Sequence, residues 1–420
     1  MAIENTAAAA AAAAPPATAT VVGAGPAGLF AVGALLDLGA TTIRWLDPDG
    51  VDGAGRLKRY GQVPSNTKVR LFTRAARAFA SFEAVWARLQ AAGGGQALAA
   101  LDALNPDDEC PLRYAADMLR ELAAGLLAAF SDRVQPIAAR VERIAPAKAD
   151  SGGRPAWTVA YGSACHTTTV VVLATGAFPA QLEGPAAPHA AVAAAVAGAV
   201  APRVIDLDDA LAPDRLAGLV AGLAGDVAVV GSSHSAVLVL KNLAEGPLAA
   251  GTAGGRRIKN FARAPFKYAE YLDETTIRYD NTGLKGAAAA WARRCVDDGA
   301  PEPIANLDRI RLAPGDEAAT YRRELPSCGA IVYAVGFART PLPTLVTDAA
   351  PAGAAAVDYG ADGQLIVARQ PCPGLYGFGI AFPERVVDVS GEPELAVGLW
   401  KFVRHIRASL TQSAAAYFKN

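Results

Sequence analysis

The sequence predicts an α/β protein with two Rossmann-like dinucleotide-binding domains, and three observations support that prediction. Residues 20–36 and 226–243 each read as a short β-branched strand, a turn of small residues and an apolar helix. A chain of 420 residues is too long for one simple core and has room for both units. Hydrophobic residues make up 52% and charged residues 19%, so a folded chain is expected rather than a disordered one.

The first turn has the form G-x-G-x-x-G and runs Gly23-Ala24-Gly25-Pro26-Ala27-Gly28. Its first glycine permits the tight turn, its second lets a pyrophosphate approach the backbone, and its third lets the helix pack against the strand. The phosphates would lie at the helix N-terminus, where unpaired N–H groups favour anions. The next strand, 42–46, ends in Asp47, which is placed to accept hydrogen bonds from ribose hydroxyls. We therefore expect cofactor contacts from Gly23, Gly25, Pro26, Ala27, Gly28 and Asp47.

A glycine-rich, basic loop follows Asp47 and covers residues 53–72. It has few apolar anchors before Val69, so it is either a solvated connection or a segment lying over the dinucleotide. In the second case its basic groups, with Arg56 first, and Asn66 and Thr67 face the cofactor. Residues 74–130 then read as mainly helical, because leucine and alanine recur at helical spacing.

Two later strands end in small residues. Residues 168–173 end in Ala174-Thr175-Gly176, and the strand of 329–337 contains Gly336 near its end. Small residues at these points let the chain approach a cofactor and cross to the next domain. We expect Ala174, Thr175, Gly176 and Gly336 to contribute to cofactor binding.

The second turn, after the strand 226–230, has the form G-x-S-x-x-A. It runs Gly231-Ser232-Ser233-His234-Ser235-Ala236, and all six residues are expected at a nucleotide. His234 either holds a position in the turn or transfers a proton. The following strand, 257–262, ends in Arg263, whose planar guanidinium suits a 2′-phosphate and favours NADPH over NADH. Alternatively Arg263 is an ordinary surface residue, and Arg256 or Arg257 could do the same work.

Charge and cysteine usage exclude several classes of protein. The net charge of −1 gives no case for nucleic acid or an anionic membrane, and the five separated cysteines indicate neither a disulfide framework nor a metal site. Residues 1–18, with an alanine run, read as a low-complexity tail without the basic start of a signal peptide. No apolar stretch reaches membrane-spanning length, so a cytoplasmic protein is expected. Residues 265–285 could line a substrate cleft or form a solvated loop. Oligomeric state cannot be read from the sequence.

These motifs together resemble the flavoproteins with two dinucleotide-binding domains (the pyridine nucleotide-disulfide oxidoreductase-like fold), and among them most closely the flavin-containing and N-hydroxylating monooxygenases. The resemblance covers the chain from Thr20 onward. It implies an FAD-binding domain made of residues 19–180 and 325–420, with an NAD(P)-binding domain, 181–324, inserted between them. Cysteine pairs suited to disulfide chemistry are missing, and the usual Gly-Asp near the chain end is replaced by Gly377-Phe378-Gly379.

The resemblance also implies roles for single residues. Asn66 would contact the reactive edge of the flavin, as the catalytic candidate, and Gly379 would lie near its ribityl and phosphate. A helix over 395–410, with Pro393 and Glu394 at its start, would direct its N-terminus at the flavin ring and stabilise negative charge there.

The implied function is oxidation of a small organic substrate. NADPH would reduce FAD, and the reduced flavin would react with dioxygen, as in a monooxygenase. Two alternatives remain open: an NAD(P)H-dependent flavin reductase or dehydrogenase without oxygen insertion, and a non-catalytic flavin-binding protein.

Overall fold

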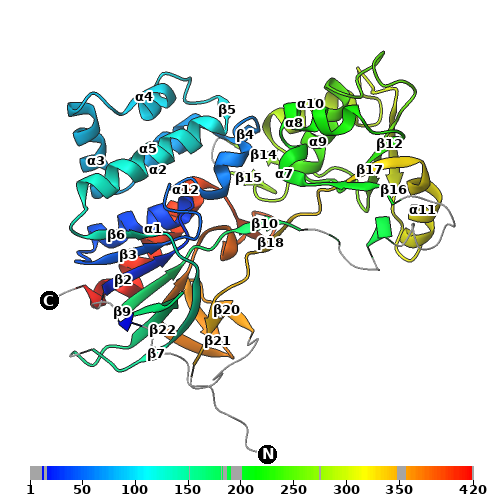
Figure 1. The fold of residues 1–420 in the computed structure, drawn as a ribbon. Helices are drawn as coiled ribbons and strands as arrows, with labels where there is room; N and C mark the ends of the chain where they lie inside the picture. Colours follow the sequence, from blue (N-terminus) through cyan, green and yellow to red (C-terminus); the bar gives the residue numbers. More distant parts are fainter. Residues whose placement is uncertain are drawn as a thin grey trace, which may run out of the picture.

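Two sheets, one in each half of the molecule, form the framework of the computed structural model (Figure 1). The structure describes residues 12–13, 17–150, 152–180, 182, 187–190, 201–273, 276–347 and 356–418. The first sheet has 11 strands and the second has 5. Helices pack against both sheets, and the predicted α/β class is confirmed.

The strands of the first sheet are β1 (Ala12–Ala13), β2 (Ala17–Val22), β3 (Ile43–Leu46), β6 (Val134–Ile137), β7 (Val141–Ala147), β8 (Ala156–Tyr161), β9 (Ala164–Leu173), β19 (Thr344–Leu345), β20 (Val357–Tyr359), β21 (Gln364–Val367) and β22 (Gln370–Gly377). Those of the second sheet are β11 (Arg203–Ile205), β12 (Asp226–Val230), β13 (Ile258–Ala262), β16 (Leu307–Arg311) and β17 (Cys328–Tyr333). Four short pairs complete the strands: β4 (Pro64–Lys68) with β5 (Glu109–Pro111), β10 (Ala177–Pro179) with β18 (Phe337–Arg339), β14 (Glu270–Tyr271) with β15 (Ile277–Arg278), and β23 (Glu384–Val387) with β24 (Pro393–Ala396).

The α-helices are α1 (Pro26–Asp37), α2 (Val69–Ala76), α3 (Ala80–Ala91), α4 (Gln96–Asp102), α5 (Arg113–Ala129), α7 (Leu207–Ala210), α8 (Pro213–Ala221), α9 (His234–Glu245), α10 (Gly286–Cys295), α11 (Glu317–Glu324) and α12 (Leu399–Ser409). Shorter helical turns are η1 (Gly55–Tyr60), η2 (Leu325–Ser327), η3 (Gly379–Ala381), η4 (Leu410–Ala414) and η5 (Ala415–Tyr417).

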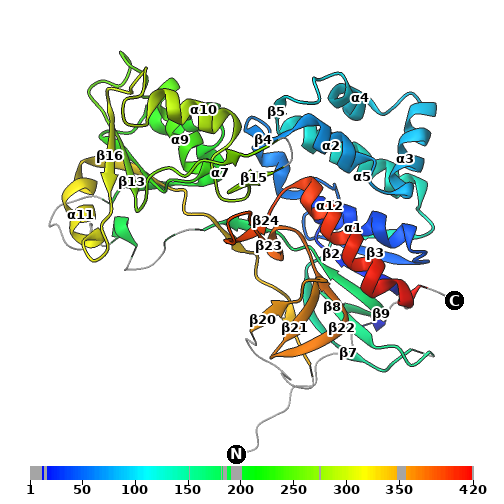
Figure 2. The same ribbon diagram turned by 180° about the vertical axis from the view of Figure 1, so that it is seen from behind.

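The first sheet places the first fingerprint at its centre. Strands β6, β3, β2, β9 and β22 run parallel in that order, while β8 and β7 continue from β9 in antiparallel fashion. Helices α1 and α12 lie side by side over one face, and the long α5 lies beyond them with α2 and α3 (Figure 2). Because α1 is buried along most of its length, its N-terminus is held rigidly at the end of β2.

The second sheet is wholly parallel, in the order β11-β17-β12-β13-β16. Helices α8, α9 and α10 share one apolar core against it. Strand β17 belongs to this sheet although it follows residue 324, the expected end of the inserted domain. The antiparallel pair β10–β18 lies where the chain passes between the two halves (Figure 1).

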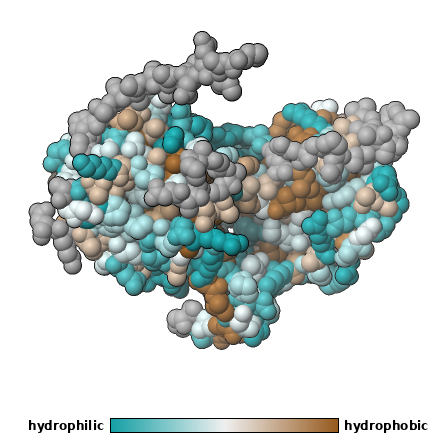
Figure 3. Space-filling model, turned by 90° about the horizontal axis from the view of Figure 1, so that it is seen from below, coloured by the Kyte–Doolittle hydropathy of each residue, from teal (hydrophilic) through white to brown (hydrophobic). Residues whose placement is uncertain are grey.

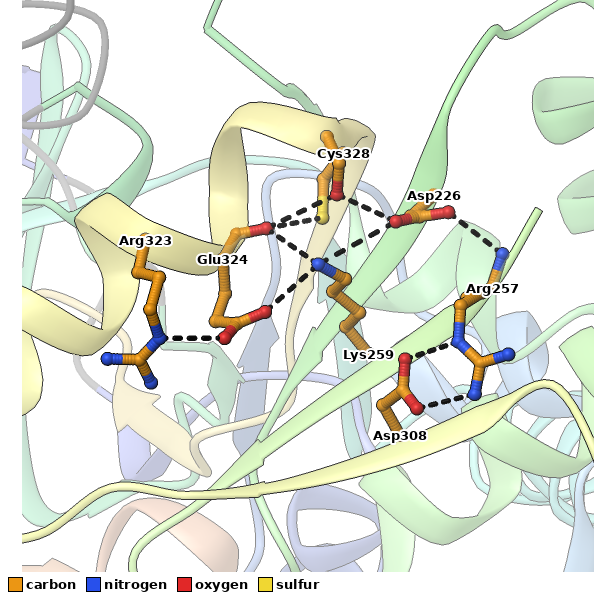
Figure 4. A network of polar contacts seen from close by, with 8 residues as sticks. Asp226, Arg257, Lys259, Asp308, Arg323, Glu324 and Cys328 are labelled. Carbon is orange, nitrogen blue, oxygen red and sulfur yellow. Dashed lines mark hydrogen bonds and ion pairs between the residues drawn. The ribbon is translucent and has the colours of Figure 1, made fainter.

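A polar network ties together the starts of the strands in the second sheet (Figure 4). Lys259, whose side chain is 11% exposed, donates to the Glu324 backbone oxygen at 3.0 Å and to its carboxylate at 3.1 Å. The Asp226 carboxylate lies 3.7 Å from Lys259 and accepts from the Arg257 backbone N–H at 2.9 Å. Because this network lies at the opposite strand ends from the Gly231 turn, its role is structural.

Replacing Lys259 by methionine should lower the free energy of unfolding by about 2 kcal/mol, since two carboxylates then lose their cationic partner. Lys259 holds the pKa of Glu324 below its ordinary value of 4.5. A lowered carboxylate pKa stabilises the fold above the unfolded-state pKa and stops doing so as pH falls through the folded value. The gap between wild type and K259M, measured by urea unfolding, should therefore shrink below about pH 4.5.

The matched control is Lys241→Met, which removes an exposed helical ion pair with Glu245. Such pairs contribute about 0.3–0.5 kcal/mol. Equal losses for K241M and K259M, or a gap that does not change with pH, would contradict this account of the network.

The predicted helix over 395–410 is wrong at its start. Pro393–Ala396 is strand β24, which pairs with β23. Helix α12 begins only at Leu399, after Gly398, whose φ of +147° separates the strand from the helix. A proline with neighbouring acids favours a helix start only where tertiary contacts allow helical backbone angles. Here the pairing of β24 with β23 holds the backbone extended. Most of the expected tail 1–18, and the alanine-rich stretch 191–200, lie outside the described residues; Ala17 and Thr18 already belong to β2.

Candidate functional site

A cavity of about 620 Å³ opens at the ends of β2 and β9, where both strands lead into glycine-containing turns. Its lining includes most of the residues expected at the first nucleotide: Gly23, Gly25, Pro26, Ala27, Asp47, Arg56, Asn66, Thr67, Ala174, Thr175, Gly176 and Gly379. Seen from below, the surface is hollowed near its middle, and a hydrophobic patch lies to one side of that hollow (Figure 3). This is the principal candidate site.

Two glycines of the first fingerprint turn leave no room for a side chain. Gly23 has φ of +108°, and a Cβ there would lie 2.2 Å from the Ala174 oxygen. A Cβ on Gly28 would lie 2.0 Å from the Gly23 oxygen, so Gly28 packs the turn from behind rather than lining the cavity. The Trp45 indole N–H donates to the Gly23 oxygen at 2.9 Å and fixes the turn from below.

Asp47 links the first fingerprint turn to the loop that follows β3. Its carboxylate accepts the Ala24 N–H at 2.8 Å and the Asp49 N–H at 2.9 Å. It lines the cavity at the end of β3, where a ribose would lie.

The Ala-Thr-Gly end of β9 contains a buried polar atom without a hydrogen-bond partner among the described residues. The Thr175 hydroxyl is buried and has no hydrogen-bond partner among the described residues, yet Thr175 lines the cavity. Buried polar atoms nearly always have a partner, so this hydroxyl is suited to a bound group. Opposite it, Gly379 has φ of +77°, and a Cβ there would lie 2.6 Å from the Ala27 Cβ. The glycine turn, the helix N-terminus, the free Thr175 hydroxyl and the cavity size together fit FAD.

Asn66 lies on β4 with an exposed side chain and lines the cavity beside Thr67. The Ser65 hydroxyl accepts the Thr67 N–H at 2.8 Å, which fixes the turn that presents Asn66. The basic loop is thus folded against the cavity and is not a free solvated connection.

Arg56 has a role beyond the cavity wall. Its guanidinium pairs with Asp208, a residue of α7 in the second half whose side chain is only 6% exposed. The Tyr60 hydroxyl donates to the same carboxylate at 2.6 Å, and burial together with this bond raises the pKa of Tyr60. The loop over the first nucleotide site is therefore also a contact between the two halves.

The second fingerprint turn repeats the geometry of the first. Gly231 has φ of +132°, and a Cβ there would lie 2.2 Å from the Ala334 oxygen. The Asn260 amide, fully buried, donates to the Gly231 oxygen at 2.9 Å, as Trp45 does for Gly23. Ser233 is the N-cap residue of α9, and Ala236 is buried beneath the turn. Ser232 and Ser235 complete the turn, and neither lines the cavity.

His234 connects the two sites. It is the first residue of α9, and within the described chain it is the one residue of the second sheet and its helices that lines the cavity. Its Nδ1 is buried without a partner among the described residues. Burial lowers the pKa of His234 to about 4, so its imidazole is neutral at pH 7.

Arg263, Gly336 and Glu394 also lie away from the cavity. Arg263 follows β13 as expected, but its exposed guanidinium forms a bidentate pair with Glu317 at 2.7 and 2.9 Å. Gly336 lies between β17 and β18 and does not line the cavity. Glu394, expected at the flavin, does not line the cavity either. Its buried carboxylate accepts from Asn281 and from the Thr282 hydroxyl, because the extended β24 turns it toward the second half.

Sequence reasoning missed the apolar residues of the cavity wall: Phe178, Phe337, Ile380, Val397, Leu399 and Phe402. A signal existed for two of them. Phe178 and Phe337 each come one or two positions after Gly176 and Gly336, at the points where the chain crosses between the halves.

Comparisons with known proteins agree with this geometry. Residues 20–178 match a family model described as FAD-NAD(P)-binding. Over 401 residues the chain is 41% identical to Monooxygenase AgnR1 of Paecilomyces divaricatus, covering 93% of this chain and 96% of the relative. The chain belongs to the family of this monooxygenase. It is an FAD- and NAD(P)H-dependent oxidoreductase.

Solved structures of low identity share the fold. The L-lysine 6-monooxygenase from Pseudomonas syringae superposes with a TM-score of 0.52 at 14% identity, covering 95% of this chain and 99% of that one. The ornithine N-hydroxylase of Kutzneria sp. 744 gives 0.52 at 16% identity with the same coverage. Among the described residues, no helix is long and apolar enough to cross a bilayer, and no cluster of metal ligands is found.

Proposed function

We propose that the protein is an FAD-dependent monooxygenase that uses NADPH and dioxygen to oxidise a small organic substrate in the cavity. One observation carries the proposal: two fingerprint turns of matching geometry come from opposite halves, and His234 of the second lines the cavity of the first. A single cavity reached from both nucleotide sites suits electron transfer between two cofactors.

Different residues of the chain would bind different parts of FAD. The N-terminal N–H groups of α1, which begins at Pro26, would bind the pyrophosphate, and Asp47 would bind the ribose. Thr175 and Asn66 would contact the ring system at the other end. When bound, FAD accepts electrons from NADPH and, once reduced, activates dioxygen. The neutral His234 would donate or accept a hydrogen bond where the two cofactors meet.

Two coarser features belong to the same proposal. We assign residues 19–180 and the chain after β18 to the FAD domain, and the part between to the NAD(P) domain. The five cysteines are all free, which suits a reducing compartment such as the cytoplasm.

Arg263 is our candidate for recognising the 2′-phosphate of NADPH. It lies at the end of β13, where a Rossmann domain holds the adenosine ribose, and in the described part of the chain its exposed guanidinium has only Glu317 as a charged partner within 4 Å. R263A should raise the KM for NADPH about tenfold and leave that for NADH unchanged, because one charge-assisted phosphate contact is lost.

The neighbouring exposed Arg322 on α11 provides the control substitution for R263A. Glu317→Gln removes the competing carboxylate and should lower the KM for NADPH. If R263A raised the KM for NADPH and for NADH equally, or if R322A raised the KM for NADPH as much as R263A, Arg263 would not be the residue that recognises the 2′-phosphate.

Oxygen incorporation tests the proposal itself. Purified holoprotein with NADPH and ¹⁸O₂ is incubated with a panel of neutral ring compounds and of amines, and products are examined by mass spectrometry. A monooxygenase places one ¹⁸O atom in a product, with NADPH consumed in proportion. Anaerobic reduction of a quinone by NADPH, with no labelled product from any compound, would favour the reductase alternative.

A further inference from the structure

Charge is distributed unevenly around the cavity. The charged lining residues fall within 47–59, as Asp47, Asp49, Asp52, Arg56, Lys58 and Arg59, with Arg140 in addition. Four other lining segments, 174–178, 337–343, 378–380 and 397–402, contribute no charged side chain to the lining. The part of the cavity lined by these four segments is here called its uncharged end.

The uncharged end is also apolar and open. Phe178 and Phe337 come from the paired crossing strands β10 and β18, in which Phe337 is opposite Pro179 and Phe178 opposite Ala338. Their side chains are 38% and 41% exposed, and Val397, at the corner between β24 and α12, is 44% exposed. All three line the cavity, so an incomplete apolar wall is left for a ligand to cover.

Nearby charges are already engaged elsewhere. Arg339 donates to the Ala381 oxygen at 2.7 Å and lies over the Phe382 ring, and it does not line the cavity. Lys401 pairs with Asp280 and donates to the Asn281 side-chain oxygen at 2.6 Å. Glu394 is held by Asn281 and Thr282. None of these groups is available to neutralise a charged substrate, and a charge buried without a partner is costly.

We propose that the substrate is an uncharged molecule with an apolar ring system, which packs against Phe178, Phe337 and Val397 at the uncharged end of the cavity. This inference rests on the proposed function and adds its substrate class. Aromatic side chains offer large flat apolar surfaces that suit rings. Two solved structures of the same fold are named for lysine and ornithine, whose side chains carry an ammonium group, and the uncharged end of this cavity contributes no acid to the lining that could receive one.

Binding is the readout, independent of turnover. Oxidised holoprotein is titrated with 1-naphthol and, separately, with L-ornithine, and binding is followed by perturbation of the flavin absorbance and by equilibrium dialysis. We expect 1-naphthol to bind and L-ornithine not to bind. Tighter binding of L-ornithine than of 1-naphthol would overturn the proposal.

Substitutions locate the site. Phe337→Glu and the milder Phe337→Ser should each weaken 1-naphthol binding at least about tenfold, because an apolar contact is lost and, in F337E, a carboxylate must be desolvated. Val389→Glu is the control: Val389 is 53% exposed on the β23–β24 turn and does not line the cavity. FAD content and melting temperature show which variants fold. If F337E does not fold, the binding result for F337S is the test. Unchanged binding in F337S, or an equal loss in V389E, would contradict the proposal.

A wrong substrate class and a wrong monooxygenase function would give different results. If NADPH reduces the flavin normally but 1-naphthol does not bind, the substrate class is wrong and the oxidoreductase remains. If 1-naphthol binds and its affinity depends on Phe337, yet no product carries oxygen from ¹⁸O₂, the binding site stands and the monooxygenase proposal does not.

Discussion

Replacing Gly23 by alanine should yield a protein that no longer retains FAD. The alanine Cβ would lie 2.2 Å from the Ala174 oxygen, and φ of +108° is a conformation that residues with a Cβ rarely adopt. The contacting atom is backbone, so relief requires β2 and β9 to separate at the point where their turns line the cavity. We expect FAD affinity to fall at least about 100-fold, or about 2.8 kcal/mol. Flavin absorbance of the purified protein measures the loss.

A glycine with open surroundings controls for the effect of positive φ alone. Gly93 has φ of +79°, and an added Cβ would meet nothing within 4 Å. G93A should keep its flavin and lose only about 1 kcal/mol of stability from backbone strain. If G23A purifies with a full complement of FAD, the first turn is not the cofactor site.

Replacing Gly231 by alanine should separate the two cofactors. Its Cβ would lie 2.2 Å from the Ala334 oxygen, the same clash as at Gly23, but in the second sheet. FAD should therefore remain bound, while the rate of flavin reduction by NADPH falls about 100-fold because the nucleotide turn is displaced. Dithionite, which needs no nucleotide site, should still reduce the flavin at the wild-type rate.

Gly251 serves as the matched control in the same half of the molecule, with φ of +89° and open space around it. G251A should be reduced by NADPH as the wild type is. Loss of FAD from G231A, or normal reduction by NADPH, would show that the second turn does not hold the nicotinamide cofactor as proposed.

Features set by local backbone geometry could be predicted from the sequence. Gly23 and Gly231 have positive φ and contact backbone atoms of a neighbouring strand, so the glycines themselves are required and visible as a motif. The strand end at Ala174-Thr175-Gly176 was recognisable because its small residues let the chain approach a cofactor. Both Rossmann units, and their confirmed α/β class, follow from such short-range requirements.

Features set by contacts between distant segments could not be predicted. Glu394 reads as a helix-start acid, but its partners Asn281 and Thr282 lie over a hundred residues away in sequence. Asp208 binds Tyr60 and Arg56 across the two halves. These partners precede it by 148 and 152 positions in the sequence, respectively. The apolar wall at Phe178 and Phe337 exists only because two crossing strands pair. The partners of each of these residues are set by tertiary contacts, and no local sequence pattern encodes such contacts.

The central claim is that one cavity holds FAD and receives electrons from NADPH. The most direct test is anaerobic stopped-flow mixing of purified protein with NADPH or NADH, followed by exposure to oxygen. We predict stoichiometric bound FAD that bleaches faster with NADPH than with NADH and is reoxidised when oxygen is admitted. A protein that neither carries nor takes up FAD, or whose flavin stays oxidised with both nucleotides, would contradict the account.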